Sequence, residues 1–232
     1  MNASMISIPS HDGQSFDAYL SLPPKGTGPG IVLIQEIFGV NQHIRTVADQ
    51  WALDGYVVLA PDLFWRQKPG VQLTYEGDDQ KLAYQYMNGM DGVHAMKDLQ
   101  STAQALRGLP QFGGKLVAMG YCMGGRLAYA LASTGALDAA VAYYGGGIQN
   151  NLGVAASVAV PIQFHYGAQD DHIPLTAVDA VKAAFAGRSN AEFHVYDGAG
   201  HGFNCWARAS YNQRASALAH GRTLQFLDKA LA

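Results

Sequence analysis

Short apolar runs alternate with longer segments of helical spacing along most of the chain. The short runs are apolar nearly throughout, which is typical of strands whose two faces are both covered by helices in a parallel sheet. These predicted strands are residues 31–34, 57–60, 116–119, 139–142 and 162–164, followed by a further strand at 193–196. Helices are predicted between or after them at residues 44–53, 93–106, 127–131, 178–185 and 218–227.

The first thirty residues have a different pattern. Apolar residues at 6–8 and 16–20 flank an Asp12-Gly13 pair, and Asp-Gly is a strong hairpin signal. The Pro/Gly-rich segment 23–30 is predicted to be a loop. The fold class is therefore predicted as α/β, with a mostly parallel sheet, helices on both faces and an N-terminal antiparallel hairpin. Its 232 residues fit a single domain spanning 1–232.

Composition narrows the function classes. Hydrophobic residues make up 49% and charged residues 14%, so the chain can bury a large core and disorder is not expected. A net charge of −3 without a basic cluster argues against nucleic acid or anionic membrane as a partner. No signal peptide, membrane span or disulfide framework is recognised, so we expect a cytoplasmic protein. We further expect a monomer, with a dimer as the alternative.

The most specific local motif is Gly120-Tyr121-Cys122-Met123-Gly124, which follows one predicted strand and begins a predicted helix. It resembles the G-x-S-x-G nucleophile turn of α/β-hydrolases, with cysteine in place of serine. Such a turn exposes the nucleophile above the sheet and places a helix N-terminus behind it, which favours a thiolate and an oxyanion. A buried structural cysteine is the alternative, but the strand-turn-helix setting favours catalysis.

Two later loops supply partners in the order expected for this turn, acid before histidine. Asp170 and Asp171 follow the strand that contains Phe164, and either carboxylate could reach the site; we favour Asp170. His201 lies between Gly200 and Gly202, after the strand at 193–196. Cys122 is predicted to be the nucleophile, His201 the base and Asp170 the group that orients the imidazole.

The segment Gln35-Glu36-Ile37-Phe38-Gly39 follows the first parallel strand. In this kind of site the backbone N–H groups of Ile37 and Met123 would bind the oxyanion. Glu36 is either a solvated carboxylate at the strand end or a group that faces the site. In the second case it interacts with Cys122 or an arginine and disfavours the thiolate until substrate displaces it.

These motifs, together with Pro61-Asp62-Leu63, Tyr143-Tyr144-Gly145 and Gly200-His201-Gly202-Phe203, resemble the dienelactone hydrolase (carboxymethylenebutenolidase) family. The resemblance implies a Cys122-His201-Asp170 triad, a Glu36 linked to the thiol, no cofactor and no lid. Separately, no histidine pair has the H-E-x-x-H spacing of a metal site, so His165, His172 and His194 are expected to be structural or solvent-facing and no metal is expected. Family members that act on dienelactone hold the substrate carboxylate with two arginines. Here Cys205 stands four residues after His201, and residues 77–81 contain no arginine.

Because Lys81 and Arg208 do not fall at the matching positions, strict dienelactone specificity is not expected. Pocket residues are predicted at Phe38, Tyr84, Tyr144 and Cys205, with Trp65 and Trp206 as further aromatic candidates. The predicted function is hydrolysis of small lactones or short esters through a cysteine acyl-enzyme. The alternative is a redox-sensing or ligand-binding module that keeps the fold without turnover.

Overall fold

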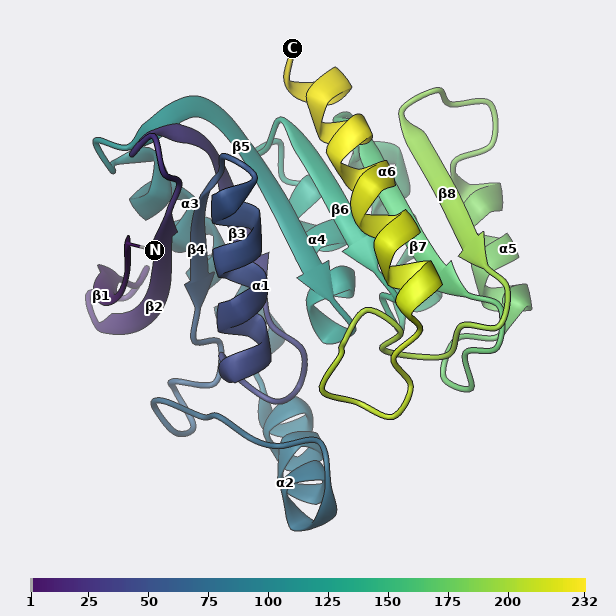
Figure 1. Ribbon diagram of the computed structural model, residues 1–232, viewed down its shortest axis with the longest axis horizontal. Coiled ribbons are helices and arrows are strands. Elements are labelled where there is room, and N and C mark those ends of the chain that lie inside the picture. The colour runs from purple at the N-terminus through teal and green to yellow at the C-terminus, as the bar shows by residue number, and fades with distance from the viewer. Residues whose placement is uncertain (1) are drawn as a thin grey trace. The chain divides into compact units, whose positions relative to one another are not determined.

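The computed structural model describes residues 2–232. The strands are β1 (Asn2–Pro9), β2 (Ser15–Leu22), β3 (Gly28–Ile34), β4 (Val57–Pro61), β5 (Phe112–Tyr121), β6 (Ala139–Tyr143), β7 (Ile162–Gly167) and β8 (Ala191–Tyr196). They form an eight-stranded sheet in the order β1-β2-β4-β3-β5-β6-β7-β8 (Figure 1). The predicted fold class is confirmed, because the sheet is mostly parallel and begins with an antiparallel hairpin.

The helices alternate with the strands after the hairpin. They are α1 (Gln42–Leu53), α2 (Gly77–Gly89), α3 (Gly92–Arg107), α4 (Met123–Ala132), α5 (Leu175–Ala184) and α6 (Gln213–Leu231), with short 3₁₀ turns at Ile148–Asn150 and Leu152–Ser157. Among the residues described, none of these helices combines the length and the apolar composition that crossing a lipid bilayer would require.

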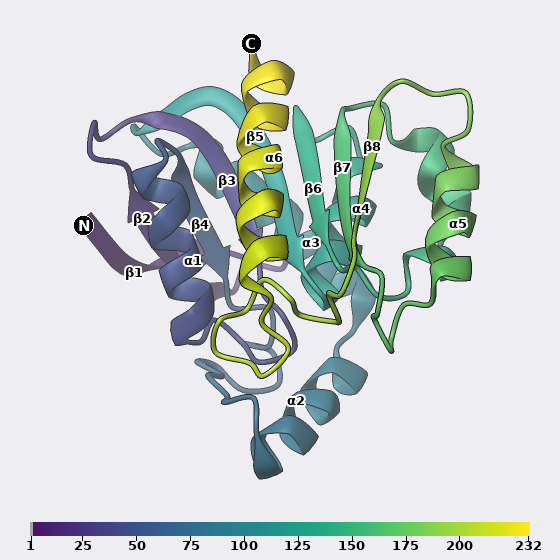
Figure 2. The same ribbon diagram turned by 45° about the vertical axis from the view of Figure 1, so that its right-hand side comes forward.

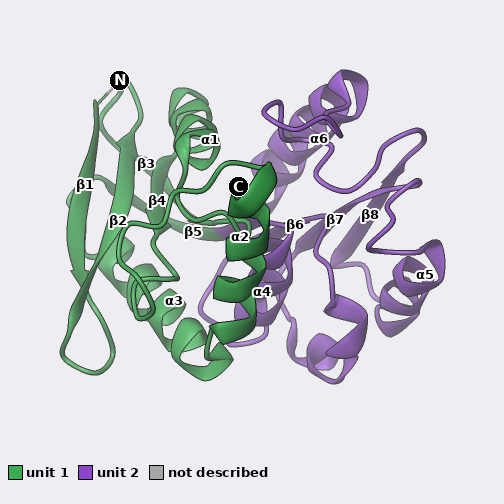
Figure 3. Cartoon of the chain, turned by 90° about the horizontal axis from the view of Figure 1, so that it is seen from below, with its two compact units in different colours: residues 1–117 green, residues 118–232 purple. Residues whose placement is uncertain are grey.

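Contacts divide the chain into two compact units, residues 1–117 and 118–232 (Figure 3). In the first unit, β1 and β2 pair through a turn in which Gly13 has a φ of +84°, as the Asp-Gly signal predicts. β2 continues antiparallel to β4, and β4 pairs in parallel with β3. Helix α1 covers one face of these strands and α3 the other (Figure 2).

The second unit contains the parallel strands β6, β7 and β8. Helix α6 lies on one face of these strands, and α4 and α5 lie on the other (Figure 3). β6 and β7 are buried along their whole length, which explains the continuous apolar sequence of β6; in β7 the buried polar residues Gln163 and His165 are hydrogen-bonded to each other at 2.8 Å. The boundary between the units falls within β5, so the prediction of a single domain stays a prediction.

Two elements differ from the sequence prediction. Strand β3 begins at Gly28, inside the segment predicted to be a loop, because its glycines allow close packing: a methyl group on Gly28 would lie 2.0 Å from the Gly55 carbonyl oxygen. Helix α2 was not predicted. Ala83 is its one buried residue, so the helix lacks the apolar periodicity that reveals a helix packed on a core.

Candidate active site

Cys122 occupies a strained turn between β5 and α4. Its φ of +56° lies in the region that favours glycine, and such a conformation in another residue costs about 1–3 kcal/mol. The backbone holds the turn from both sides: the Cys122 N–H donates to the Tyr143 carbonyl at 3.0 Å, and the Cys122 carbonyl accepts from Gly125 N–H at 3.0 Å. Strain of this kind is found where a side chain must project in one direction for function.

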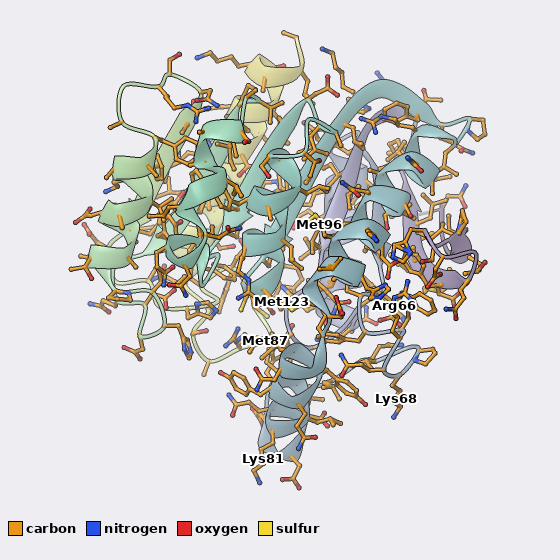
Figure 4. The ribbon with its side chains drawn as sticks, turned by 180° about the vertical axis from the view of Figure 1, so that it is seen from behind. Arg66, Lys68, Lys81, Met87, Met96 and Met123 are labelled. Atoms are coloured by element: carbon orange, nitrogen blue, oxygen red, sulfur yellow. The ribbon has the colours of Figure 1, made fainter. Side chains whose placement is uncertain are left out.

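The glycines of the motif are required by close packing around this turn. A methyl group on Gly120 would lie 2.0 Å from the Gly124 carbonyl oxygen, and one on Gly125 would lie 2.7 Å from the Tyr143 carbonyl oxygen. Met123 is the first residue of α4 and is labelled in Figure 4. The first N–H groups of a helix have no partner within the helix, so this end of α4 can bind negative charge.

The structure brings the side chains of Cys122, His201 and Asp170 together. His201 Nε2 lies 3.1 Å from Cys122 Sγ, and His201 Nδ1 lies 2.9 Å from Asp170 Oδ2. The Asp170 side chain is fully buried, the His201 side chain is 10% exposed and Cys122 is partly exposed. All three belong to the second unit. The Cys122 thiol, the His201 imidazole and the Asp170 carboxylate are thus connected by hydrogen bonds in this order.

Asp170, rather than Asp171, is the carboxylate that contacts His201. Asp170 Oδ1 accepts hydrogen bonds from the backbone N–H of His172 at 2.8 Å and of Ile173 at 3.0 Å, which leaves Oδ2 directed at the ring. Asp171 is exposed. The sequence left both carboxylates open because they are adjacent, and only the conformation of this turn distinguishes them.

The acid loop and the histidine loop are joined by backbone hydrogen bonds. Ala168 N–H donates to the Tyr196 carbonyl at 2.9 Å, and Gln169 N–H donates to the Ala199 carbonyl at 2.9 Å. These bonds continue the pairing of β7 with β8 beyond the ends of both strands. The distance between Asp170 and His201 is therefore fixed by the sheet.

The surroundings of His201 alter its acidity strongly. Burial by itself favours the neutral ring, but hydrogen bonds to Asp170 and Cys122 and the charges of both groups raise the pKa of His201 to about 10. At neutral pH the ring then carries a positive charge 3.1 Å from Sγ. A cation in this position favours the thiolate, which is the nucleophilic form of cysteine.

Further aromatic rings surround the imidazole. The ring of Tyr144, fully buried, meets His201 edge-on with centroids 5.3 Å apart, and Phe203 packs behind Tyr144 at 5.3 Å. The exposed ring of His172 meets His201 at 4.8 Å. His172 therefore faces solvent and also contacts the imidazole of His201. Its position two residues after Asp170 is the one sequence signal for this contact.

The remaining predicted residues are divided between the units. Glu36, Ile37 and Phe38 lie in the first unit and are buried there, and Phe38 packs against Tyr75 at 4.5 Å. Tyr84 lies on α2 and is 39% exposed. Trp65 stacks on Phe16 at 5.4 Å.

In the second unit, Cys205 is fully buried and its N–H donates to the Gly202 carbonyl at 2.9 Å, within the histidine loop. Trp206 is 43% exposed. Cys122 is a free thiol.

Three kinds of comparison with known proteins identify the same family. Residues 16–231 match the model of the Dienelactone hydrolase family. A carboxymethylenebutenolidase of Pseudomonas putida is 38% identical over 224 residues, which cover 96% of this chain and 94% of that protein. A protein of Azospirillum brasilense, provisionally named a carboxymethylenebutenolidase, is 39% identical over 97% of this chain and 98% of its own length. A crystal structure from Klebsiella pneumoniae, provisionally named a dienelactone hydrolase, superposes with a TM-score of 0.86 at 30% identity and 98% coverage of both chains.

Proposed function

Because this chain belongs to the dienelactone hydrolase family, and is thus a hydrolase of the α/β-hydrolase fold, we propose that it cleaves small lactones or short esters through an acyl-enzyme on Cys122. The observation that carries the proposal is the position of the His201 ring, 3.1 Å from Cys122 Sγ on one side and 2.9 Å from Asp170 Oδ2 on the other. A base oriented by an acid beside a nucleophile is the arrangement that covalent catalysis requires.

In acylation, the Cys122 thiol transfers its proton to His201 Nε2. The sulfur attacks the carbonyl carbon of the substrate, and the carbonyl oxygen becomes an oxyanion. Met123 N–H, at the N-terminus of α4, stabilises this oxyanion, and Ile37 N–H is the second donor predicted from the sequence. When the intermediate collapses, the C–O bond breaks and the alkoxide takes the proton from His201 Nε2. A thioester remains on Cys122.

Deacylation uses the same groups in reverse. His201 is now neutral and takes a proton from water, which attacks the thioester carbonyl. The second tetrahedral intermediate expels the Cys122 thiolate and releases a carboxylic acid. Asp170 keeps Nδ1 protonated in both steps, so that Nε2 is always the nitrogen that exchanges the proton. The sum of the two steps is the addition of one water molecule to the ester.

The substrate carries a carbonyl with a good leaving group. Thiolate catalysis suits esters, lactones and thioesters better than amides, whose leaving group is more basic. The two arginine positions of the dienelactone-cleaving family members are not kept here, and Cys205, at one of them, is fully buried. We therefore propose a substrate range wider than carboxylate-bearing lactones.

Site-directed substitution tests the nucleophile. Cys122→Ala is expected to abolish hydrolysis of p-nitrophenyl acetate and acyl labelling detected by mass spectrometry, with an unchanged circular dichroism spectrum. Ser157→Ala, at an exposed serine of the same unit, is the control and should keep the activity. Turnover by Cys122→Ala within about tenfold of the parent protein would remove Cys122 from this role.

A panel of substrates tests the specificity. Lactones and short esters, each compared with and without a carboxylate, should be cleaved with similar kcat/KM if no carboxylate clamp operates. A strong preference for the carboxylate-bearing members would contradict the wider range. No turnover of any member, with Cys122 still reactive toward iodoacetamide, would favour the redox-sensing or ligand-binding alternative.

A further inference from the structure

Two histidines from distant parts of the first unit meet at the surface. His11 lies in the turn between β1 and β2, and His94 lies in the first turn of α3. His11 Nε2 and His94 Nδ1 are 3.1 Å apart, and the ring centroids are 5.0 Å apart. The carboxylate of Asp12 adjoins them, so that one ligand atom from each residue lies within 4.8 Å of the other two.

From this geometry we propose that His11, Asp12 and His94 bind a divalent transition metal of the zinc class. Imidazole nitrogens with a carboxylate oxygen are a ligand set that Zn²⁺ accepts. Two nitrogens bound to one Zn²⁺ at ~2.0–2.1 Å with a tetrahedral angle lie roughly 3.3 Å apart. The observed separation of 3.1 Å is close to this value.

The carboxylate of Asp12 is held in place by two neighbouring groups. Arg66, labelled in Figure 4, contacts Asp12 through Nη1 and Oδ2 at 2.6 Å. Gln14 also donates its backbone N–H to Asp12 Oδ1 at 3.2 Å, which fixes the carboxylate in the turn.

The local charge favours a cation in spite of Arg66. The same guanidinium also pairs with the buried Asp98 at 3.0 Å, and Asp91 accepts from the His94 N–H at 3.0 Å. Asp12 and Asp98 thus both pair with this one guanidinium, and Asp91 lies at the start of α3 beside the His94 N–H, so the three carboxylates outnumber the guanidinium by two. Each of these carboxylates already forms a hydrogen bond or ion pair in the folded protein. Metal binding therefore requires no rearrangement of the backbone.

A metal at this position joins the hairpin turn to α3. The two ends of the cluster are separated by 83 positions in the sequence, and each already packs in the first unit. A ligand that binds the folded state alone stabilises it in proportion to its free concentration. A metal bound at this site therefore holds the hairpin turn against α3. This role is structural and does not involve the reaction at Cys122.

Calorimetric titration with Zn²⁺ tests the site. The protein should carry no polyhistidine tag and should contain Cys122→Ala, because a thiol beside an imidazole can itself bind Zn²⁺. One Zn²⁺ is expected to bind per chain. His11→Ala and His94→Gln should each weaken binding at least ~tenfold, as loss of one of three ligands predicts. His220→Gln on α6 is the matched control and should leave the affinity unchanged.

Thermal unfolding gives an independent measurement. Zn²⁺ should raise the midpoint of thermal unfolding of the Cys122→Ala protein and of the same protein with His220→Gln. It should not raise the midpoint of the same protein with both His11→Ala and His94→Gln. Because His11 is exposed and His94 partly exposed, these variants should fold normally in the absence of metal. Equal Zn²⁺ affinity and equal midpoint shifts with and without the two histidines would overturn the proposal, as would the absence of Zn²⁺ binding.

Discussion

Gly167 packs directly against the backbone of Ala199: a methyl group on Gly167 would lie 2.3 Å from the Ala199 carbonyl oxygen. Gly167 ends β7, three residues before Asp170, and Ala199 lies two residues before His201. This contact permits the backbone hydrogen bonds that join the acid loop to the histidine loop. The spacing of Asp170 and His201 therefore depends on the absence of a side chain at residue 167.

Gly167→Ala is expected to separate these loops. Insertion of a methyl group against packed backbone should lower the free energy of unfolding by about 1–3 kcal/mol. A displacement near 1 Å at the site should lower kcat/KM by about 10²-fold. Ester hydrolysis and urea denaturation measure the two effects. Gly221→Ala in α6, where a methyl group meets no atom within 4 Å, should keep full activity. Unchanged kcat/KM in Gly167→Ala would show that the loop contact does not position the site.

Asp170→Asn should impair catalysis without loss of the fold. The side-chain oxygen of asparagine can still accept from the backbone N–H groups of His172 and Ile173, but its amide would then face His201 Nδ1 and favour the wrong tautomer. By analogy with other triads, kcat should fall by up to ~10⁴-fold. Steady-state kinetics with Asp171→Asn as the control checks this. A large loss in Asp171→Asn instead would reverse the assignment of the acid.

Stability should depend on pH through His201. The pKa of this ring is about 10 in the folded protein and about 6.5 in the unfolded chain, so the folded state binds the proton more tightly. Its contribution is present in full below about pH 6.5 and is lost as pH rises through about 10. Urea denaturation across this range should show a steeper decrease for the parent protein than for His201→Gln. Parallel curves would contradict the raised pKa.

Glu36→Gln tests the predicted control of the thiol. A carboxylate that acts on Cys122 disfavours the thiolate, so its neutralisation should increase the rate at which iodoacetamide labels Cys122 at a given pH. Mass spectrometry of the labelled peptide distinguishes Cys122 from Cys205. Glu76→Gln, at an exposed glutamate of the same unit, should leave the rate unchanged. Identical rate–pH profiles for Glu36→Gln and the parent protein would dismiss the gating role.

Much of the fold was predictable because its signals are local. The run Ile31-Val32-Leu33-Ile34 is typical of a strand buried on both faces, and every residue of it is fully buried. The Asp12-Gly13 pair predicted the hairpin, because glycine readily adopts the positive φ of such a turn. The motif from Gly120 to Gly124 predicted the turn before α4, because its glycines allow close backbone packing. Helix α2 was missed because its residues are mostly exposed and lack a periodic apolar face.

The features of the candidate site can likewise be separated into those that the sequence predicted and those that only the structure showed. By itself, the sequence determined which residue types stand at the carboxyl ends of which strands, and so predicted Cys122, His201 and an acid at 170 or 171. The tertiary structure decided which carboxylate faces the ring, that His172 and Tyr144 pack against it, and that His11 meets His94 across 83 positions. The physical reason is that local propensity and hydrophobic patterning act over a few residues. The distance between two side chains on separate loops depends instead on strand register and on close backbone contacts, which no single segment encodes.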